Sequence, residues 1–152
     1  MVGLAAAAAA QTSITLLGVP VPDRIAGIPH EPPHDYESSH PGLGYGVSFK
    51  QDGWIIDVFI YDMRRSAIPA DPASDVIQQQ LAQATADIRE FERRGSYANL
   101  VPADGYVIKD RSGKARFACL AFSFRMTRVQ ADVASHLCVG SFNNKFVKIR
   151  MT

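Results

Sequence analysis

Long hydrophobic runs are missing from this chain of 152 residues, and no stretch approaches the roughly 20 apolar residues that cross a bilayer as a helix. We therefore expect a protein that does not span a membrane. A strong net charge is also missing, because the formal charge is only +1 and the pI is near 7.8. Since aromatic residues are not interleaved with the basic ones either, the sequence argues against nucleic-acid binding.

The composition is otherwise typical of a globular domain. Hydrophobic residues make up 47% of the chain and charged residues 20%, which differs from disordered and collagen-like sequences. A chain of this length buries roughly 70% of the surface that it exposes when unfolded, so it needs no metal or disulfide to form a core. We expect one domain over residues 11–152, as a monomer or a weak homodimer.

The start of the chain, Met1-Val2-Gly3-Leu4 followed by six alanines, is similar to the end of a secretory signal peptide. Small residues at Ala8–Ala10 are typical of a signal-peptidase site, with cleavage before Gln11. We interpret residues 1–10 as a truncated signal-peptide remnant, which predicts a periplasmic or secreted protein. The alternative is a disordered, alanine-rich tail.

Cysteine is scarce, with only Cys119 and Cys138 present. An exported chain with two cysteines favours a disulfide. If a loop of about six residues begins at Arg128, however, the two cysteines share a face but are staggered by about four residues, beyond the reach of a bridge. A disulfide and two buried free thiols both remain open.

The clearest strand signals form a hairpin over residues 46–62, with Asp52-Gly53 at the tight turn. Both faces of its second strand are largely apolar, which indicates a central strand covered on both sides. A short strand over residues 14–21 precedes it. Between them, residues 20–46 hold six prolines and four glycines, which predict a loop or an extended segment wrapped over the surface.

One strong helix is predicted over Pro72–Arg94, with Asp71 as its N-cap and Gly95 as its stop signal. Its apolar stripe is formed by Ile77, Leu81, Ala84, Ile88 and Phe91. Everything after Gly95 alternates as strands, with turns at 110–113 and 143–144. The fold class is therefore α+β, an antiparallel sheet of about five to seven strands packed against one long helix.

Charge is divided unevenly along the chain. From Lys109 onward there are nine basic and two acidic residues, a charge of +7, whereas the first 108 residues hold seven basic and 13 acidic residues, a charge of −6. In the last strand, Lys148 and Arg150 alternate with apolar residues, which predicts a half-buried strand with a basic outer face. Such a face suits an anionic ligand or an unknown envelope protein, unless the two halves neutralise each other.

Histidines gather in one segment, where His30-Glu31-Pro32-Pro33-His34 has the letters of the zinc-protease motif. That motif needs a helix, and two central prolines forbid one. A looser metal site remains possible, with His30, His34, His40 and Asp35 as candidate ligands, against a solvated loop as the default. The glycines of Gly42-Leu43-Gly44-Tyr45-Gly46 precede a strand and not a helix, so we expect a bend and no phosphate cradle.

Two further constellations stand out. Asp57 lies inside a strongly apolar strand beside Tyr61, and a buried acid there needs a raised pKa or a basic partner such as Arg125, Lys148 or Arg150. His136 and Cys138 share one face of a strand, as a Cys-His hydrolase would require. We see no residue to orient that pair, so ordinary packing is the competing interpretation for His136 and Cys138. For Asp57 the competing interpretation is a structural ion pair or exposure at an edge.

The order of elements resembles the PsbP/Mog1/DcrB-like α/β sandwich group over about residues 45–152. The segments that carry the resemblance are Val47-Ser48-Phe49 through Gly53-Trp54, the helix from Asp71 to Gly95, and the closing strands from Ser135 to Arg150. The resemblance implies a non-catalytic partner-binding or accessory protein and transfers no functional residue. The terminal helix usual in that group has no counterpart here.

The sequence as a whole favours an exported binding or accessory domain with no cofactor and no chemistry of its own. No constellation supplies a nucleophile, a base and an orienting group together. The alternative is a small hydrolase that uses either a metal in the loop at 30–40 or the His136 and Cys138 strand. The specific ligand and biological process do not follow from the sequence.

Overall fold

The computed structural model describes residues 12–152, so the predicted signal-peptide remnant at 1–10 lies outside the described residues. Within this range, no helix has the length and apolarity needed to cross a membrane. The elements in chain order are β1 (Ser13–Leu16), β2 (Val19–Pro22), β3 (Arg24–Ile25), β4 (Ile28–Pro29), β5 (His34–Asp35), β6 (Tyr45–Gln51), β7 (Trp54–Tyr61), α1 (Asp75–Arg93), β8 (Tyr97–Pro102), β9 (Tyr106–Lys109), β10 (Ala115–Met126), β11 (Ala131–Phe142) and β12 (Lys145–Met151).

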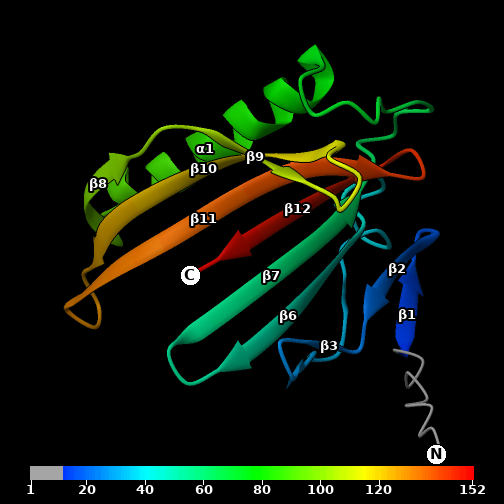
Figure 1. The fold of residues 1–152 in the computed structure, drawn as a ribbon. Helices are drawn as coiled ribbons and strands as arrows, with labels where there is room; N and C mark the ends of the chain where they lie inside the picture. Colours follow the sequence, from blue (N-terminus) through cyan, green and yellow to red (C-terminus); the bar gives the residue numbers. More distant parts are fainter. Residues whose placement is uncertain (1–11) are drawn as a thin grey trace, which may run out of the picture.

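The main sheet is antiparallel throughout and has the strand order β5-β6-β7-β12-β11-β10-β8, with β9 also paired to β10 (Figure 1). The predicted antiparallel sheet with one helix is confirmed. The sheet has eight strands, however, more than the five to seven expected. The count rises because β8 and β9 pair with successive parts of the long strand β10, and because the two-residue strand β5 adds to the other edge.

The helix begins later than predicted. Ser74 is the N-cap, and its side chain accepts a hydrogen bond from the Ile77 backbone N–H. Asp71 instead accepts from the amide of Ala73 in the turn before the helix, so the prediction of Asp71 as N-cap was wrong. At the other end Gly95 adopts a φ of +82° and stops the helix as expected.

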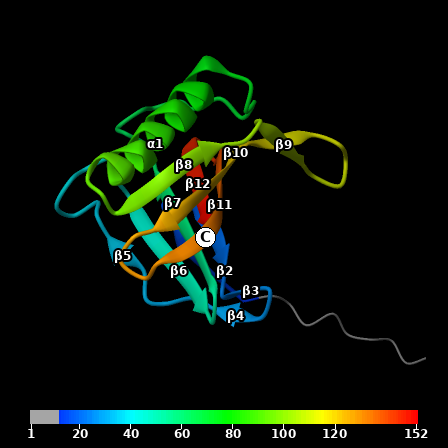
Figure 2. The same ribbon diagram turned by 90° about the vertical axis from the view of Figure 1, so that its left-hand side faces the viewer.

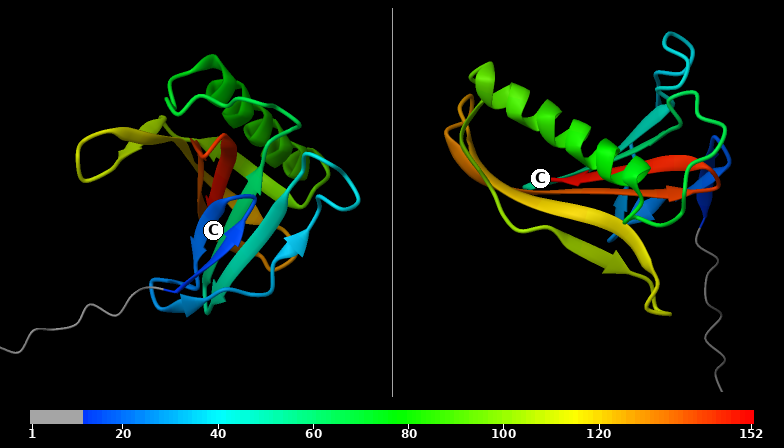
Figure 3. Two further views of the ribbon diagram at one scale, coloured as in Figure 1. Left: turned by 90° about the vertical axis from the view of Figure 1, so that its right-hand side faces the viewer. Right: turned by 90° about the horizontal axis from the view of Figure 1, so that it is seen from above.

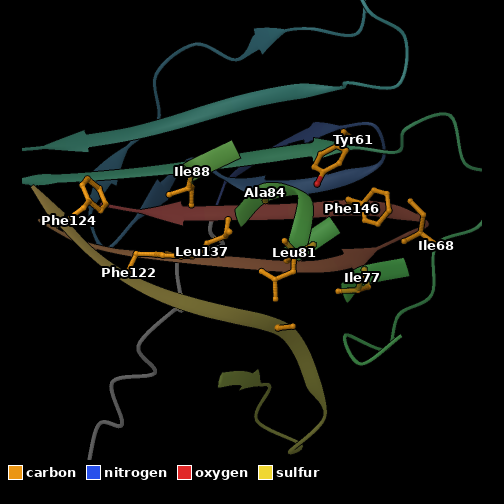
Figure 4. Close-up of a cluster of buried hydrophobic side chains, with 12 residues drawn as sticks. Tyr61, Ile68, Ile77, Leu81, Ala84, Ile88, Phe122, Phe124, Leu137 and Phe146 are labelled. Carbon is orange, nitrogen blue, oxygen red and sulfur yellow. The ribbon is translucent and has the colours of Figure 1, made fainter. Parts of the chain in front are cut away.

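The buried stripe of α1 consists of Ile77, Leu81, Ala84 and Ile88. These side chains pack against Phe122, Phe124, Leu137 and Phe146 of the sheet (Figure 4). Phe91, predicted to continue the stripe, is exposed at its end, where its ring lies against that of Tyr97.

The second face of the sheet is covered in part by the N-terminal segment, opposite the helix (Figures 2 and 3). The proline-rich stretch is more regular than a loop, because β2, β3 and β4 lie in it and form small two-stranded sheets. Val19, Val21 and Ile28 from this segment pack on Val58 and Ile60 of β7. Since Phe59 and Tyr61 on the other face of β7 pack with the helix-side core, the prediction of a strand covered on both sides is confirmed.

Cys119 and Cys138 form a disulfide, and they lie directly opposite each other in the β10–β11 register. The expected stagger was wrong, because β10 and β11 continue to Met126 and Ala131 and are joined by a four-residue turn at 127–130, not by the longer loop assumed. Both cysteines are almost fully buried. The bridge therefore locks the two longest strands of the sheet together.

Removing the disulfide should lower stability. It joins residues 19 apart in the sequence, and a cross-link of that span restricts the unfolded chain by about 3 kcal/mol. In urea denaturation followed by circular dichroism, the Cys119→Ala/Cys138→Ala variant should lose about 3 kcal/mol of unfolding free energy. As a control, wild-type protein reduced in denaturant and refolded in reductant should match the variant, whose own stability reductant should not change. A loss under about 1 kcal/mol would contradict this account.

Candidate functional site: a cleft beside the helix

The helix covers only part of the sheet face on which it lies. Its backbone lies closest to β11, β8 and β10, whereas β7 and β12 meet it through side chains such as Tyr61 and Phe146. The same face of β7 and β12 forms the floor of a cleft alongside α1. Two pockets, of about 280 and 220 Å³, lie in this cleft and share Phe59, Ala84, Asp87 and Lys148. The shared residues make the two pockets parts of one candidate site.

Three elements enclose the larger pocket. Phe59, Tyr61 and Lys148 form the floor. The helix forms one wall through polar residues at spacings of three and four, which places them on one stripe beside the buried one; they are Gln80, Gln83 and Asp87. The opposite wall is apolar and aromatic and comes from the segments before β6 and after β7; it consists of Tyr36, Leu43 and Met63.

The conformation of the loop that supplies Tyr36 and Leu43 is fixed by the carboxylate of Glu37. Glu37 accepts hydrogen bonds from the backbone N–H groups of Gly42 and Gly44, at 3.0 and 2.8 Å. Gly42 and Gly44 have φ values of +98° and +63°, which confirms the predicted bend into β6. Gly44 also packs so closely on the backbone of Ile60 that a Cβ would collide with its carbonyl group. The wall of the cleft is therefore fixed by backbone geometry.

Lys148 is the most unusual residue of the site. Its ammonium nitrogen lies 4.7 Å from the centre of the Phe59 ring and 5.6 Å from that of Tyr61. Burial lowers the pKa of Lys148 below its ordinary value; the charge of Asp87 opposes this lowering, and that of Arg150 adds to it. Within residues 12–152, Lys148 makes no hydrogen bond or ion pair, so the two aromatic rings are its main contacts.

The predicted basic outer face was wrong. β12 is a central strand between β7 and β11, and its face with Lys148 and Arg150 is partly buried on the helix side, so it is not an exposed outer face. Val147, Ile149 and Met151 pack with the N-terminal segment, so Lys148 and Arg150 turn toward the helix side. There they line the smaller pocket together.

Asp57 lies opposite Arg150 in the β7–β12 register and lines the same pocket. Its carboxylate accepts a hydrogen bond from the Ser48 hydroxyl. Arg150 itself donates to the hydroxyl oxygens of Tyr97 and Ser135, at 2.9 and 3.3 Å. Asp57 thus lines the same pocket as Lys148 and Arg150, but the ion pairs of the described residues do not include it, so its partner is the Ser48 hydroxyl and not one of the predicted basic residues.

Two other predicted binding residues have different outcomes. Tyr61 lies in the cleft, where its hydroxyl donates to the side-chain oxygen of Gln80 at 3.0 Å. Burial, and then the charge of Asp87, raise the pKa of Tyr61 far above its ordinary value. Arg125 lies away from the cleft and pairs with Asp132 near the β10–β11 turn.

The candidate metal ligands do not come together. Asp35 accepts from the backbone N–H and hydroxyl of Ser38, and these bonds lower its pKa. His30 lies near Asp23, His34 contacts the ring of Tyr36, and His40 contacts Ser39. No group of three or more histidine, cysteine or acidic residues suited to a metal ion occurs among the residues described.

The His136 and Cys138 strand is held by structural contacts. Cys138 is bonded to Cys119, so its sulfur is not a free thiolate. A hydrogen bond of 2.8 Å joins Nδ1 of His136 to the hydroxyl of Tyr106, whose pKa burial raises. In the oxidised protein this pair therefore lacks the nucleophile that a Cys-His hydrolase needs.

Comparisons of this chain with protein-family models, with curated proteins and with solved structures find no significant match. The site must therefore be interpreted from its own geometry.

Sequence reasoning missed several cleft residues, namely Phe59 as an aromatic partner, both residues of the loop wall, and the polar helix stripe. The stripe had a signal, because Gln80, Gln83 and Asp87 repeat at helical spacing directly beside the apolar stripe. The loop wall had none, since Tyr36 and Leu43 reach the cleft only through the packing of Gly44 on β7.

Replacing Lys148 should remove an unfavourable buried charge. A lowered pKa means that the folded protein binds this proton less tightly than the unfolded chain does. The destabilisation is therefore present below the folded pKa and disappears as the pH rises through it toward 10.5. In urea denaturation, Lys148→Met should be more stable than wild type by roughly 1 kcal/mol near neutral pH, and less so at alkaline pH.

The control for this comparison is Lys109→Met, at an exposed position on β9, which should show no such pH-dependent difference. If Lys148→Met were the less stable protein near neutral pH, the contacts of the ammonium with Phe59 and Tyr61 would outweigh its desolvation.

Gly44→Ala should be much more damaging than Gly53→Ala. Both glycines have positive φ, but a Cβ at Gly53 meets nothing within 4 Å, whereas one at Gly44 collides with Ile60. We expect losses of about 1 kcal/mol for Gly53→Ala and about 3 kcal/mol or more for Gly44→Ala, measured by urea denaturation. Equal losses would mean that the loop wall shifts freely.

Proposed function

We propose that this chain is an exported, non-catalytic binding domain whose ligand lies in the cleft between α1 and the floor formed by β7 and β12. The observation that carries the proposal is the composition of the cleft. A cavity of about 280 Å³ is lined largely by apolar and aromatic side chains with a few polar groups. This is the usual make-up of small-molecule sites, at a volume just below their usual range.

Two observations support export. The disulfide between Cys119 and Cys138 is of a kind that forms and persists in oxidising compartments. The alanine-rich start of the sequence supports the same location. A periplasmic or secreted domain of this size gains stability from such a bridge.

Binding is favoured over the alternative of a hydrolase by the state of the residues that a hydrolase would use. Cys138 is held in the disulfide, and His30, His34 and His40 each contact a different neighbour. The resemblance in element order to the PsbP/Mog1/DcrB-like group supports a binding or accessory role as well. Either an envelope protein or a free ligand would contact this chain in the cleft.

The neutral aromatic dye N-phenyl-1-naphthylamine tests the proposal, because its fluorescence rises in apolar pockets. We expect saturable binding at one site in wild-type protein. Gln83→Trp, on the helix wall, should fill the cleft and weaken binding about tenfold or more, since an indole ring takes up much of a cavity of this size.

The matched control is Ala82→Trp, which adds the same side chain at the next position, on an exposed side of α1 turned away from the cleft. This variant should bind the dye as wild type does. Absence of saturable binding in wild type, or equal weakening by both tryptophans, would contradict a site in the cleft.

A further inference from the structure

Among the described residues that line the two pockets, Lys148 is the one lysine, and its ammonium group has no hydrogen-bond acceptor. Lys148 lines both pockets, and no buried side-chain nitrogen or oxygen of the described residues lacks a hydrogen-bond partner. Since Lys148 makes no hydrogen bond, its Nζ atom must still reach open space, and the open space beside it is the cleft. Lys148 therefore offers three N–H donors to whatever occupies the cavity.

The other charged groups of the cleft are already engaged or lie at its edge. Asp57 accepts from Ser48, and Arg150 donates to Tyr97 and Ser135. Asp87 is exposed on the helix and accepts a hydrogen bond from Gln83 at 3.1 Å. The N–H donors of Lys148 therefore suit an anionic group of a ligand, and the negative charge of Asp87 disfavours such a group.

The space in front of Lys148 is largely apolar, apart from the polar stripe of the helix wall. Phe59 and Tyr61 lie beneath the ammonium group, and Tyr36, Leu43 and Met63 line the opposite wall. A ligand whose charged end meets Lys148 has to place the rest of its body against these side chains. A fully hydrated inorganic ion would leave that apolar surface uncovered.

We infer that the ligand of this cleft is a small organic monoanion, a carboxylate or sulfonate on an apolar or aromatic body, with its acidic group hydrogen-bonded to Lys148. This inference rests on the proposed function and names the class of ligand for the same site. Asp87 acts as a specificity residue, because its negative charge at the mouth of the cleft disfavours dianions and limits the affinity for monoanions.

Two dyes with the same skeleton test the inference. 1-Anilinonaphthalene-8-sulfonate is an anion, and N-phenyl-1-naphthylamine is its neutral counterpart. Wild-type protein should bind the anion about tenfold more tightly than the neutral dye, as expected for one hydrogen-bonded ion pair in a partly buried site. Fluorescence titration of the folded protein gives both dissociation constants.

Variants at two positions give the test its specificity. Lys148→Met should bring the ratio of the two dissociation constants close to one, while Lys148→Arg should keep at least part of the preference for the anion. Asp87→Asn should raise the preference for the anion about threefold, because it removes one opposing charge at the edge of the site. Lys109→Met, at an exposed lysine outside the cleft, is the matched control and should behave as wild type.

The outcomes distinguish a failure of the proposed binding function from a failure of the inference that the ligand is an anion. If neither dye binds, the proposed function itself fails. If the neutral dye binds and the anion binds no more tightly, the cleft is a binding site but the inference of an anionic ligand is overturned. The inference is equally overturned if Lys148→Met retains the preference for the anion, because the sulfonate would then be held elsewhere.

Discussion

The width of a single helix limits how much of one face of the sheet α1 can cover. A helix with its side chains is about 10 Å across, and neighbouring strands are about 4.8 Å apart, so one helix covers roughly two to three strands. The sheet has eight strands, and α1 lies over the β11, β10 and β8 side of it. The same face of β7 and β12 is therefore only partly covered by α1, through side chains such as Gln80, which bonds to Tyr61. The cleft lies along this partly covered part of the sheet.

Strand β12 shows how the two faces of the sheet serve different purposes. Its alternate residues Val147, Ile149 and Met151 pack with the N-terminal hairpins, whereas Lys148 and Arg150 point to the helix side. Arg150 is satisfied there by Tyr97 and Ser135. Lys148 makes no hydrogen bond among the described residues; its ammonium group lies over the rings of Phe59 and Tyr61, and Asp87 of the helix acts on it only through its charge. A buried cation without an acceptor is costly, which is typical of a position kept for binding.

Two local devices keep the cleft in shape. The disulfide between Cys119 and Cys138 joins β10 to β11, the strands that carry the helix. On the far side, Glu37 fastens the loop wall by accepting from the N–H groups of Gly42 and Gly44. The loop wall and the strands beneath the helix are therefore each held in place independently of any ligand, and a preformed cavity loses less entropy when it binds.

Local patterns in the sequence were sufficient to predict the main elements. The apolar stripe from Ile77 to Ile88, the stop at Gly95 and the Asp52-Gly53 turn each depend on residues close together in the chain, so they determine the helix and the central hairpin. The helix start was misplaced by a few residues because Asp71 and Ser74 are both good caps, and packing chose between them.

Only the tertiary structure decided the rest. The pairing of Cys119 with Cys138 depends on a strand register set by the short turn at 127–130, and one residue of slip reverses every side chain. The face occupied by Lys148 depends on the neighbours that β12 acquires, which lie far away in the sequence. The sequence by itself determined the helix, the central hairpin and most of the apolar stripe that forms the helix-side core. Long-range packing determined which polar groups meet, and therefore where the candidate site lies.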